Sequence, residues 1–218
     1  MIREHDSEPV PGLPEALPPG EHILWQGSPA WPSLARHAFH AGKIAIYCAL
    51  IVAWRVIADL NDGLGAGAAL IGGLWLAPLA AVAIGLPTFF GWLYARTTIY
   101  TITNRRVVIR SGVAIPTAFN LPFKVVGAAA VRRHRDGTGD LPLSLVGADR
   151  IAYLHLWPNA RPWRLRQPEP MLRSVPEAAR VAEILRRALS AAAGLPSQAR
   201  LGEDAGTEAP PRLAKAAA

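Results

Sequence analysis

A run of basic side chains is the part of this sequence best suited to bind a charged partner. Residues 98–113, TIYTITNRRVVIRSGV, follow residues 63–95, a stretch of thirty-three residues without a charge. Four arginines lie in or beside the run: Arg96, Arg105, Arg106 and Arg110. Three partners suit them: anionic lipid, an acidic surface of a client protein, or nucleic acid.

We favour lipid for these arginines, because each basic residue near an anionic membrane surface contributes about 1 kcal/mol to binding. An acidic surface of a client protein is the second candidate. We expect no nucleic-acid binding, because no recognition helix is apparent and a domain tethered at a bilayer has poor access to nucleic acid.

Two histidines, His37 and His40, are the weak candidates for a ligand site. If this segment is helical, their i,i+3 spacing puts them on one face, where they could bind a metal or the magnesium of a chlorin. We favour the alternative that they are interfacial histidines that hydrogen-bond headgroups or loop backbone.

Signals for catalysis are poor. The sequence has no Gly-x-Ser-x-Gly, P-loop, His-Glu-x-x-His or Cys-x-x-Cys motif, and Cys48 is its single cysteine. We therefore expect a protein that is not an enzyme, with no catalytic residue, no cofactor and no metal.

Composition indicates a membrane protein with a basic extramembrane part. Of the 218 residues, 51% are hydrophobic and 18% are charged, the latter low for a soluble domain. Residues 1–43 carry three Lys or Arg against five Asp or Glu, and residues 44–95 carry one against two. Residues 96–218 carry nineteen against nine, so the basic character follows the apolar stretch.

The apolar stretch predicts a transmembrane hairpin within residues 40–95. One span covers about residues 40–58 and a second about 64–86, ended or kinked at Pro87. An aromatic interfacial belt follows: Phe89, Phe90, Trp92 and Tyr94. Whether residues 63–95 form one long broken helix or a span plus an interfacial segment stays open. Two crossings are favoured over three by the arginines beyond the second span and the acidic linker between the spans.

A small residue recurs at every fourth position of the second span. The stripe comprises Gly65, Ala69, Gly73, Ala77, Ala81 and Gly85. Such a stripe lets another helix approach closely. The second helix could belong to the chain's own first span, to a second copy or to a client protein, and the sequence does not decide among them.

Residues 96–194 predict a cytoplasmic β-domain. About six short β-type runs, among them residues 151–157 and 163–167, recur at intervals of about eight to twelve residues, as in an antiparallel sandwich or barrel. A closing helix over residues 175–193 follows, with a capping box from Ser174 to Glu177. Residues 1–39 form a Pro-rich cytoplasmic segment, and residues 195–218 are expected to be disordered.

Three blocks carry a resemblance to a known family. They are PGEHILWQGSPAWPSLARHAFH before the first span, YTITNRRVVIRSG after the second, and PEPMLRSVPEAARVAEIL at the closing helix. With these blocks the chain resembles the PuhB family of photosynthetic reaction-centre assembly proteins of purple bacteria, which are membrane-anchored bacterial PH-like domains. The resemblance covers about residues 8–190.

The resemblance implies an α+β membrane protein in which a two-helix hairpin precedes a PH-like antiparallel domain capped by a C-terminal helix. It implies a non-catalytic assembly factor for the reaction centre, and indirectly for the core light-harvesting complex. Partners would be nascent reaction-centre subunits, other photosynthetic assembly factors and anionic lipid, with a homodimer as a further candidate.

We expect a multi-pass protein of the bacterial inner membrane, cytoplasmic or intracytoplasmic, with both termini in the cytoplasm. The alternative function is a general membrane-anchored PH-like module that binds anionic lipid or envelope proteins.

Overall fold

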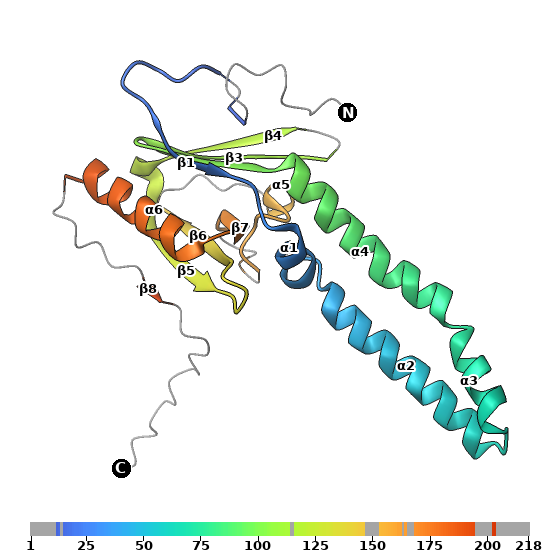
Figure 1. Cartoon of the computed structure of the whole chain (residues 1–218). Helices are drawn as coiled ribbons and strands as arrows, with labels where there is room; N and C mark the ends of the chain where they lie inside the picture. Colours follow the sequence, from blue (N-terminus) through green and yellow to red (C-terminus); the bar gives the residue numbers. More distant parts are fainter. Residues whose placement is uncertain are drawn as a thin grey trace, which may run out of the picture.

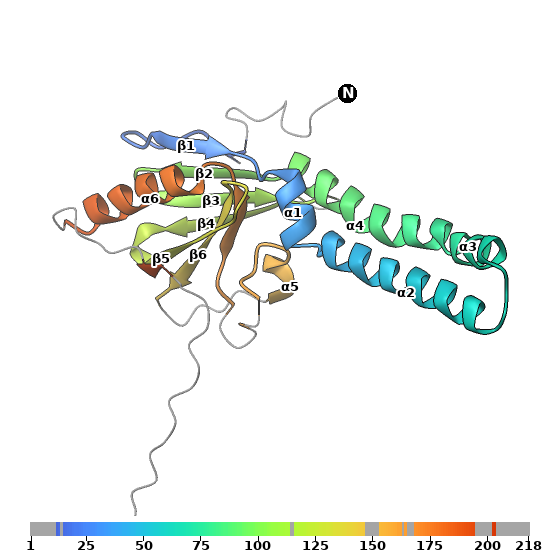
Figure 2. The same ribbon diagram turned by 60° about the horizontal axis from the view of Figure 1, so that its bottom comes forward.

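An apolar helical hairpin projects from a β-domain made of two sheets (Figures 1 and 2). The computed structural model describes residues 12–13, 15–113, 116–146, 153–162, 164, 168–194 and 202–203. The predicted strand at residues 163–167 lies outside this part of the chain except for residue 164. The predicted disordered tail lies outside it except for residues 202–203.

The hairpin consists of α2 (Ala41–Asn61), which runs outward, and α3 (Ala66–Leu74) with α4 (Ala77–Thr97), which return. Both arms are long and apolar enough to cross a membrane. In the most apolar stretch of eighteen residues, only 6% of α2 is buried, and in the corresponding stretch of the returning arm only 11% is buried. The core helix of a soluble protein would be mostly buried, so the two arms indicate a membrane protein.

The returning arm is broken at a different place from the one predicted. The break lies at Trp75 and Leu76, within one turn of the poor helix formers Gly72 and Gly73. Pro87 stands inside α4, and the helix continues past it for ten residues to Thr97. A proline removes one backbone donor but does not end a helix that neighbouring structure supports. The predicted end of the helix at Pro87 is therefore wrong, whereas a kink at Pro87 and the end of the membrane span at about residue 86 stay predictions.

The β-domain contains eight strands in the described part of the chain. They are β1 (Ile23–Gly27), β2 (Ile99–Thr103), β3 (Arg106–Ser111), β4 (Thr117–Pro122), β5 (Val126–Arg133), β6 (Gly139–Leu145), β7 (Met171–Val175) and β8 (Gly202–Glu203). One sheet has the order β1-β2-β3-β4 and the other β7-β6-β5-β8. All neighbours are antiparallel except β5 and β8. The predicted antiparallel domain is confirmed.

The larger hydrophobic core lies between the two sheets and α6 (Ala178–Ala192), and a smaller cluster of Leu34, Tyr94 and Ala95 lies where α1 (Trp31–His37) meets α4. The predicted apolar face of α6 enters this core through Ala178, Val181, Ala182 and Leu185, with Leu189 partly buried. Two shorter helices, α1 and α5 (Tyr153–Leu156), and the 3-10 turn η1 (Phe123–Val125) complete the described elements.

Two local predictions in this region are wrong. The run at residues 151–157 was expected as a strand, but its described part forms α5, because so short an apolar run does not distinguish a helical turn from a strand. The capping box does not form either: Ser174 belongs to β7 and its backbone N–H bonds to Asp140, while Glu177 is the N-cap residue in a left-handed conformation.

Strand β1 makes the N-terminal segment part of the β-domain. It pairs with β2 at the edge of the first sheet, from Ile23 opposite Thr103 to Gly27 opposite Tyr100. The apolar run HILWQG is the sequence signal that could have indicated this strand. The chain thus builds one edge of the domain before it enters the hairpin and the remaining strands after it leaves.

Candidate functional site

A buried hydrogen-bond chain joins the hairpin to the β-domain. Asn159 donates from Nδ2 to the Tyr94 hydroxyl of α4 at 2.9 Å and accepts from the Tyr100 hydroxyl of β2 at 3.0 Å. The Tyr100 hydroxyl also accepts from the backbone N–H of Arg173 in β7 at 3.1 Å. Because Tyr100 and Asn159 are fully buried, these bonds hold the end of α4 in a fixed orientation against the sheets.

Helix α1 is inserted between the hairpin and the β-domain. It packs so closely on α4 that a Cβ placed on Gly91 would lie 3.0 Å from Ala35. On its other side, Ser33 Oγ and Thr138 Oγ1 are 2.7 Å apart, and the Ala30 N–H donates to the Ser174 carbonyl at 2.8 Å. Helix α1 therefore contacts both the hairpin and the β-domain and fixes the angle between them.

Two stacked imidazoles complete this junction. The rings of His37 and His134 lie 3.9 Å apart and nearly parallel, and His134 Nε2 is 3.3 Å from Asp140 Oδ2. The other carboxylate oxygen of Asp140 accepts from the Ser174 N–H at 2.9 Å. Burial raises the pKa of Asp140, but the contacts with His134 and the Ser174 N–H outweigh it and leave the pKa below its usual value.

The junction is expected to lose stability in mild acid. Partial burial, and next the charge of His134, lower the pKa of His37, although Asp140 and Asp136 oppose this. Burial, and next the charges of Lys43 and Arg173, lower the pKa of His40. His37 and His40 therefore bind a proton more weakly in the folded chain than in the unfolded chain. As a consequence, stability falls as the pH drops through about 6.5, the pKa of an unfolded histidine, toward the lowered pKa values of the folded chain.

This pH dependence can be measured as the melting temperature of the purified chain in mild detergent between about pH 7.5 and 5.5. We expect the decrease toward acid to be smaller in a His37→Gln, His40→Gln double variant. Asp140 does not contribute to this window, because its pKa lies lower still. If the melting temperature of the double variant falls toward acid as steeply as that of the wild type, these histidines do not cause the loss of stability.

The two histidines do not share a helical face. His37 is the last residue of α1, and His40 is the left-handed N-cap residue of α2, with φ of 57°. The shared helix that the ligand hypothesis required is therefore absent from this segment. His37 has one ring face covered by His134. Among the described residues, no group of three or more His, Cys, Asp or Glu is placed to hold a metal ion.

The structure divides the four predicted arginines into two pairs. Arg96 lies in the last turn of α4, with its guanidinium 5.0 Å from the Trp92 ring centroid, and Arg110 pairs with Ile99 at the same end of the sheet. Arg105 and Arg106 follow β2 at the opposite end. At about 3.4 Å per residue, the five residues of β2 separate the pairs by about 17 Å. The four arginines therefore do not form one cluster at the end of α4.

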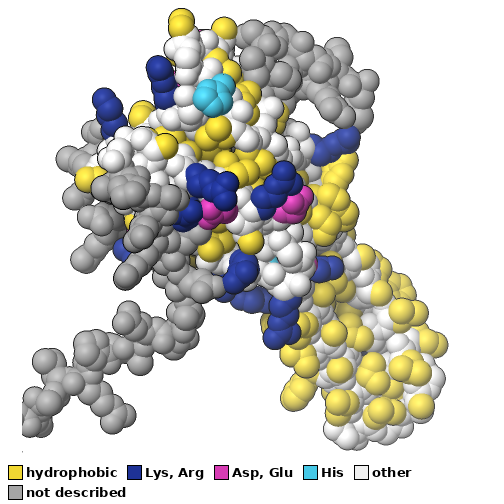
Figure 3. Space-filling model, turned by 60° about the vertical axis from the view of Figure 1, so that its left-hand side comes forward, with side chains coloured by type: hydrophobic (Ala, Val, Ile, Leu, Met, Phe, Trp, Pro, Cys, Tyr) yellow, Lys and Arg dark blue, Asp and Glu magenta, His cyan; other side chains and the backbone are white. Residues whose placement is uncertain are grey.

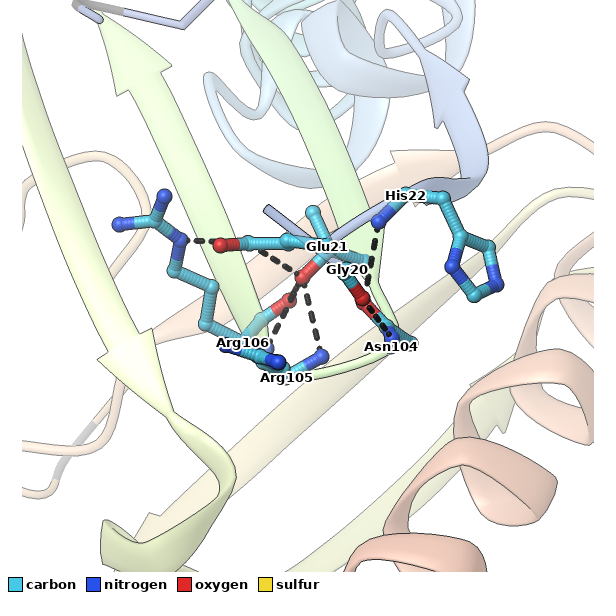
Figure 4. A network of polar contacts seen from close by, with 7 residues as sticks. Gly20, Glu21, His22, Asn104, Arg105 and Arg106 are labelled. Atoms are coloured by element: carbon cyan, nitrogen blue, oxygen red, sulfur yellow. Dashed lines mark hydrogen bonds and ion pairs between the residues drawn. The ribbon is translucent and has the colours of Figure 1, made fainter. Parts of the chain in front are cut away.

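Arg106 and its neighbours fasten the N-terminal segment to the β2–β3 turn (Figure 4). Arg106 Nε donates to the buried carboxylate of Glu21 at 2.7 Å, and Thr103 Oγ1 donates to the same oxygen at 2.9 Å. Asn104 accepts from the His22 N–H and donates to the Gly20 carbonyl. Asn104 does not have a positive φ, so its role is not that of a left-handed turn residue. It ties two segments together instead.

The small-residue stripe is also divided. Ala69 and Gly73 are buried against α2, where a Cβ on Gly73 would lie 2.6 Å from Val56 Cγ2. The other four members, Gly65, Ala77, Ala81 and Gly85, are exposed. Ala69 and Gly73 therefore pack within the hairpin. Gly65 lies before α3, whereas Ala77, Ala81 and Gly85 follow the break at Trp75 and remain open to a further helix.

The junction was not predicted from the sequence, although His37 was named as a candidate ligand and Tyr94 as a member of the aromatic belt. Asn159, His134 and Asp140 lie in loops and strand ends, without a motif or spacing that links them. They come together only because the sheet registers and α1 bring distant segments into contact. The regular apolar period of the hairpin gave no information about them.

Comparison with known proteins gives two matches. Residues 44–189 match the family described as bacterial PH domain, a range that includes both arms of the hairpin and α6. A protein of Rhodobacter capsulatus, named "Uncharacterized 23.7 kDa protein in puhA 5'region", is 39% identical over 190 residues, which cover 86% of this chain and 88% of that protein. No solved structure matches the chain. With its apolar hairpin, antiparallel sheets and closing helix, the chain belongs to the bacterial PH domain family.

Proposed function

We propose that this protein is a non-catalytic assembly factor for the photosynthetic reaction centre, and indirectly for the core light-harvesting complex. The observation that carries the proposal is its similarity to a protein whose name places it in the 5′ region of puhA in a photosynthetic bacterium. The extent of the match, 86% of this chain, includes the hairpin as well as the β-domain.

The geometry supports a mechanism based on binding. The hairpin leaves its apolar residues and the small residues Ala77, Ala81 and Gly85 open, so another helix can pack on it within a bilayer. Figure 3 shows hydrophobic side chains over the hairpin, whereas Lys and Arg gather on the β-domain. The junction at Asn159 and α1 would keep both surfaces in one orientation toward a client subunit.

The charges favour a position in the inner membrane with both termini in the cytoplasm. Lys43 begins α2 and Arg96 ends α4, so both lie where the hairpin meets the β-domain. The far end of the hairpin carries Asp59 and Asp62, and Arg55 there is paired with Asp59 at 3.0 Å. Because Lys and Arg concentrate on the cytoplasmic side of membrane proteins, the β-domain would lie in the cytoplasm.

Affinity capture tests the binding mechanism directly. The tagged chain would be isolated from mildly solubilised membranes while photosynthetic complexes are being made. We expect reaction-centre subunits among the captured proteins, in excess over a capture with an unrelated tagged membrane protein. Capture of lipid and general envelope proteins without these subunits would favour a general membrane-anchored PH-like module instead.

A further inference from the structure

The β-domain has a groove at the end that lies away from the hairpin. Its volume is about 910 Å3, and it runs between the β2–β3 turn, the segment from η1 into β5, and the last turns of α6. It is lined by Asn104, Arg105, Pro122, Phe123, Lys124, Val126, Gly127, Ala128, Ala129, Arg186, Leu189, Ser190, Ala192 and Ala193. We call this surface the distal groove.

The floor of the distal groove is apolar with one unused polar group. Phe123, Val126 and Leu189 belong to the edge of the hydrophobic core, and alanines continue the surface along β5 and α6. The Ser190 side chain is almost fully buried, with 3% exposed, and its hydroxyl has no hydrogen-bond partner in the described part of the chain. The oxygen itself has almost no exposed surface, so the floor that a ligand meets is apolar.

The walls of the distal groove are positive. Arg105 and Lys124 are exposed, and neither has an ion-pair partner among the described residues. The lining contains no acidic residue. Hydrogen bonds from Arg186, and next from Arg187, lower the pKa of Glu183 to about 2, so Arg186 stays paired at neutral pH. Two cations therefore remain available for an anionic ligand.

The position of the groove favours a polypeptide over the lipid surface. It lies at the β2–β3 turn, about 17 Å along the strands from the end of α4, at 3.4 Å for each residue of β2. It also follows the outer edge of β5. That edge is already shown to accept a strand, because Ala130 and Val131 pair with Gly202 and Glu203 of β8. An extended segment can add main-chain hydrogen bonds at such an edge.

The part of the chain that leads into β8 is a poor match for this charge. Residues 195–201, LPSQARL, contain Arg200 but no acidic residue, and Glu203 of β8 pairs with Val131, which lies outside the groove lining. A positive segment would meet Arg105 and Lys124 with repulsion. Charge complementarity therefore favours a segment of another polypeptide.

We propose that the distal groove binds an extended acidic segment of a partner protein. Its carboxylates pair with Arg105 and Lys124, its small apolar side chains lie on Phe123 and Val126, and its backbone runs along the β5 edge. If the proposed assembly function holds, this inference says what kind of segment the client protein presents. The inference itself is argued from the groove and does not depend on which protein the client is.

Peptide binding to the intact chain in nanodiscs made of neutral lipid tests this proposal. The probe is a fluorescein-labelled octapeptide that alternates glutamate and alanine, and its matched control has glutamine in place of glutamate. Fluorescence anisotropy should show binding of the acidic peptide that is at least tenfold tighter than that of the glutamine peptide. An Arg105→Gln, Lys124→Gln double variant should weaken binding of the acidic peptide at least tenfold.

Two further variants separate the groove from general charge and from folding. Arg36→Gln with Arg135→Gln removes the same charge from exposed positions outside the groove and should leave peptide binding unchanged. Ala128→Glu adds a negative charge at an exposed groove position and should abolish binding while the melting temperature stays the same. A result in which both double variants weaken binding equally would overturn the assignment to the groove.

Three other outcomes would also overturn the proposal: no binding of either peptide, equal binding of both, or displacement of the acidic peptide by phosphatidylglycerol vesicles. The last outcome would identify the groove as a lipid site. If the peptide binds as expected while loss of the gene leaves reaction-centre content normal, the result supports the groove as a peptide site and refutes the assembly function. If the peptide does not bind but loss of the gene lowers reaction-centre content, the groove proposal fails and the assembly function stands.

Discussion

Replacing Asn159 by alanine should release the hairpin from the β-domain. The substitution removes one partner of the Tyr94 hydroxyl and one partner of the Tyr100 hydroxyl inside a buried region. Each buried polar group that loses a partner costs about 1–3 kcal/mol, so for the two hydroxyls we expect a loss of about 2–6 kcal/mol of folding free energy. For a chain of this size, each kcal/mol lowers the melting temperature by roughly 2–4 °C.

Asn104→Ala is the matched control for this substitution. Asn104 also makes two hydrogen bonds with its amide group, to the His22 N–H and the Gly20 carbonyl, but at a turn where water can replace them. We expect a loss below about 1 kcal/mol. Thermal unfolding in mild detergent, followed by tryptophan fluorescence, compares the two variants. Equal losses would show that the buried chain of hydrogen bonds does not stabilise the junction.

Replacing Gly73 by isoleucine should separate the two arms of the hairpin. A Cβ at this position would already lie 2.6 Å from Val56 Cγ2, and isoleucine adds three further carbons. Overpacking of this kind typically costs about 1–3 kcal/mol. We expect a lower melting temperature and weaker capture of partners, because a displaced returning arm would no longer present its outer face correctly.

Gly85→Ile is the comparison that isolates the outer face. A Cβ on Gly85 would meet no atom within 4 Å, so the hairpin itself should keep its melting temperature. If the exposed small residues Ala77, Ala81 and Gly85 contact a client helix, the bulky side chain should still reduce captured reaction-centre subunits several-fold. Normal capture with this variant would remove the outer face as a client surface.

The hairpin was predicted from the length of its apolar, nearly uncharged stretch, which is enough for two spans. The buried face of α6 was predicted from the helical period of its apolar residues, because burial against a core repeats along a helix. The break in the second arm was misplaced because Pro87 is a strong signal in isolation. In the folded chain, Thr88 Oγ1 donates to the Ile84 carbonyl at 2.7 Å and α4 continues.

The functional surfaces were much harder to predict, because they depend on register. Arg105 and Arg106 follow Arg96 by only about ten residues, so the sequence suggested one basic cluster at the membrane. The course of β2 carries the two residues to the opposite end of the domain, where Arg106 pairs with Glu21 from the N-terminal segment. The distal groove joins three segments that are far apart in the sequence, and no local pattern in any of them indicates it.

The central claim is that this protein is needed to build the reaction centre. Its most direct test is the reaction-centre content of membranes from a strain lacking the gene, measured by absorption spectroscopy and compared with the parent and with the complemented strain. The account predicts a several-fold lower content in the deletion strain, restored by the wild-type gene, with normal aerobic growth. Parental reaction-centre content in the deletion strain would contradict it.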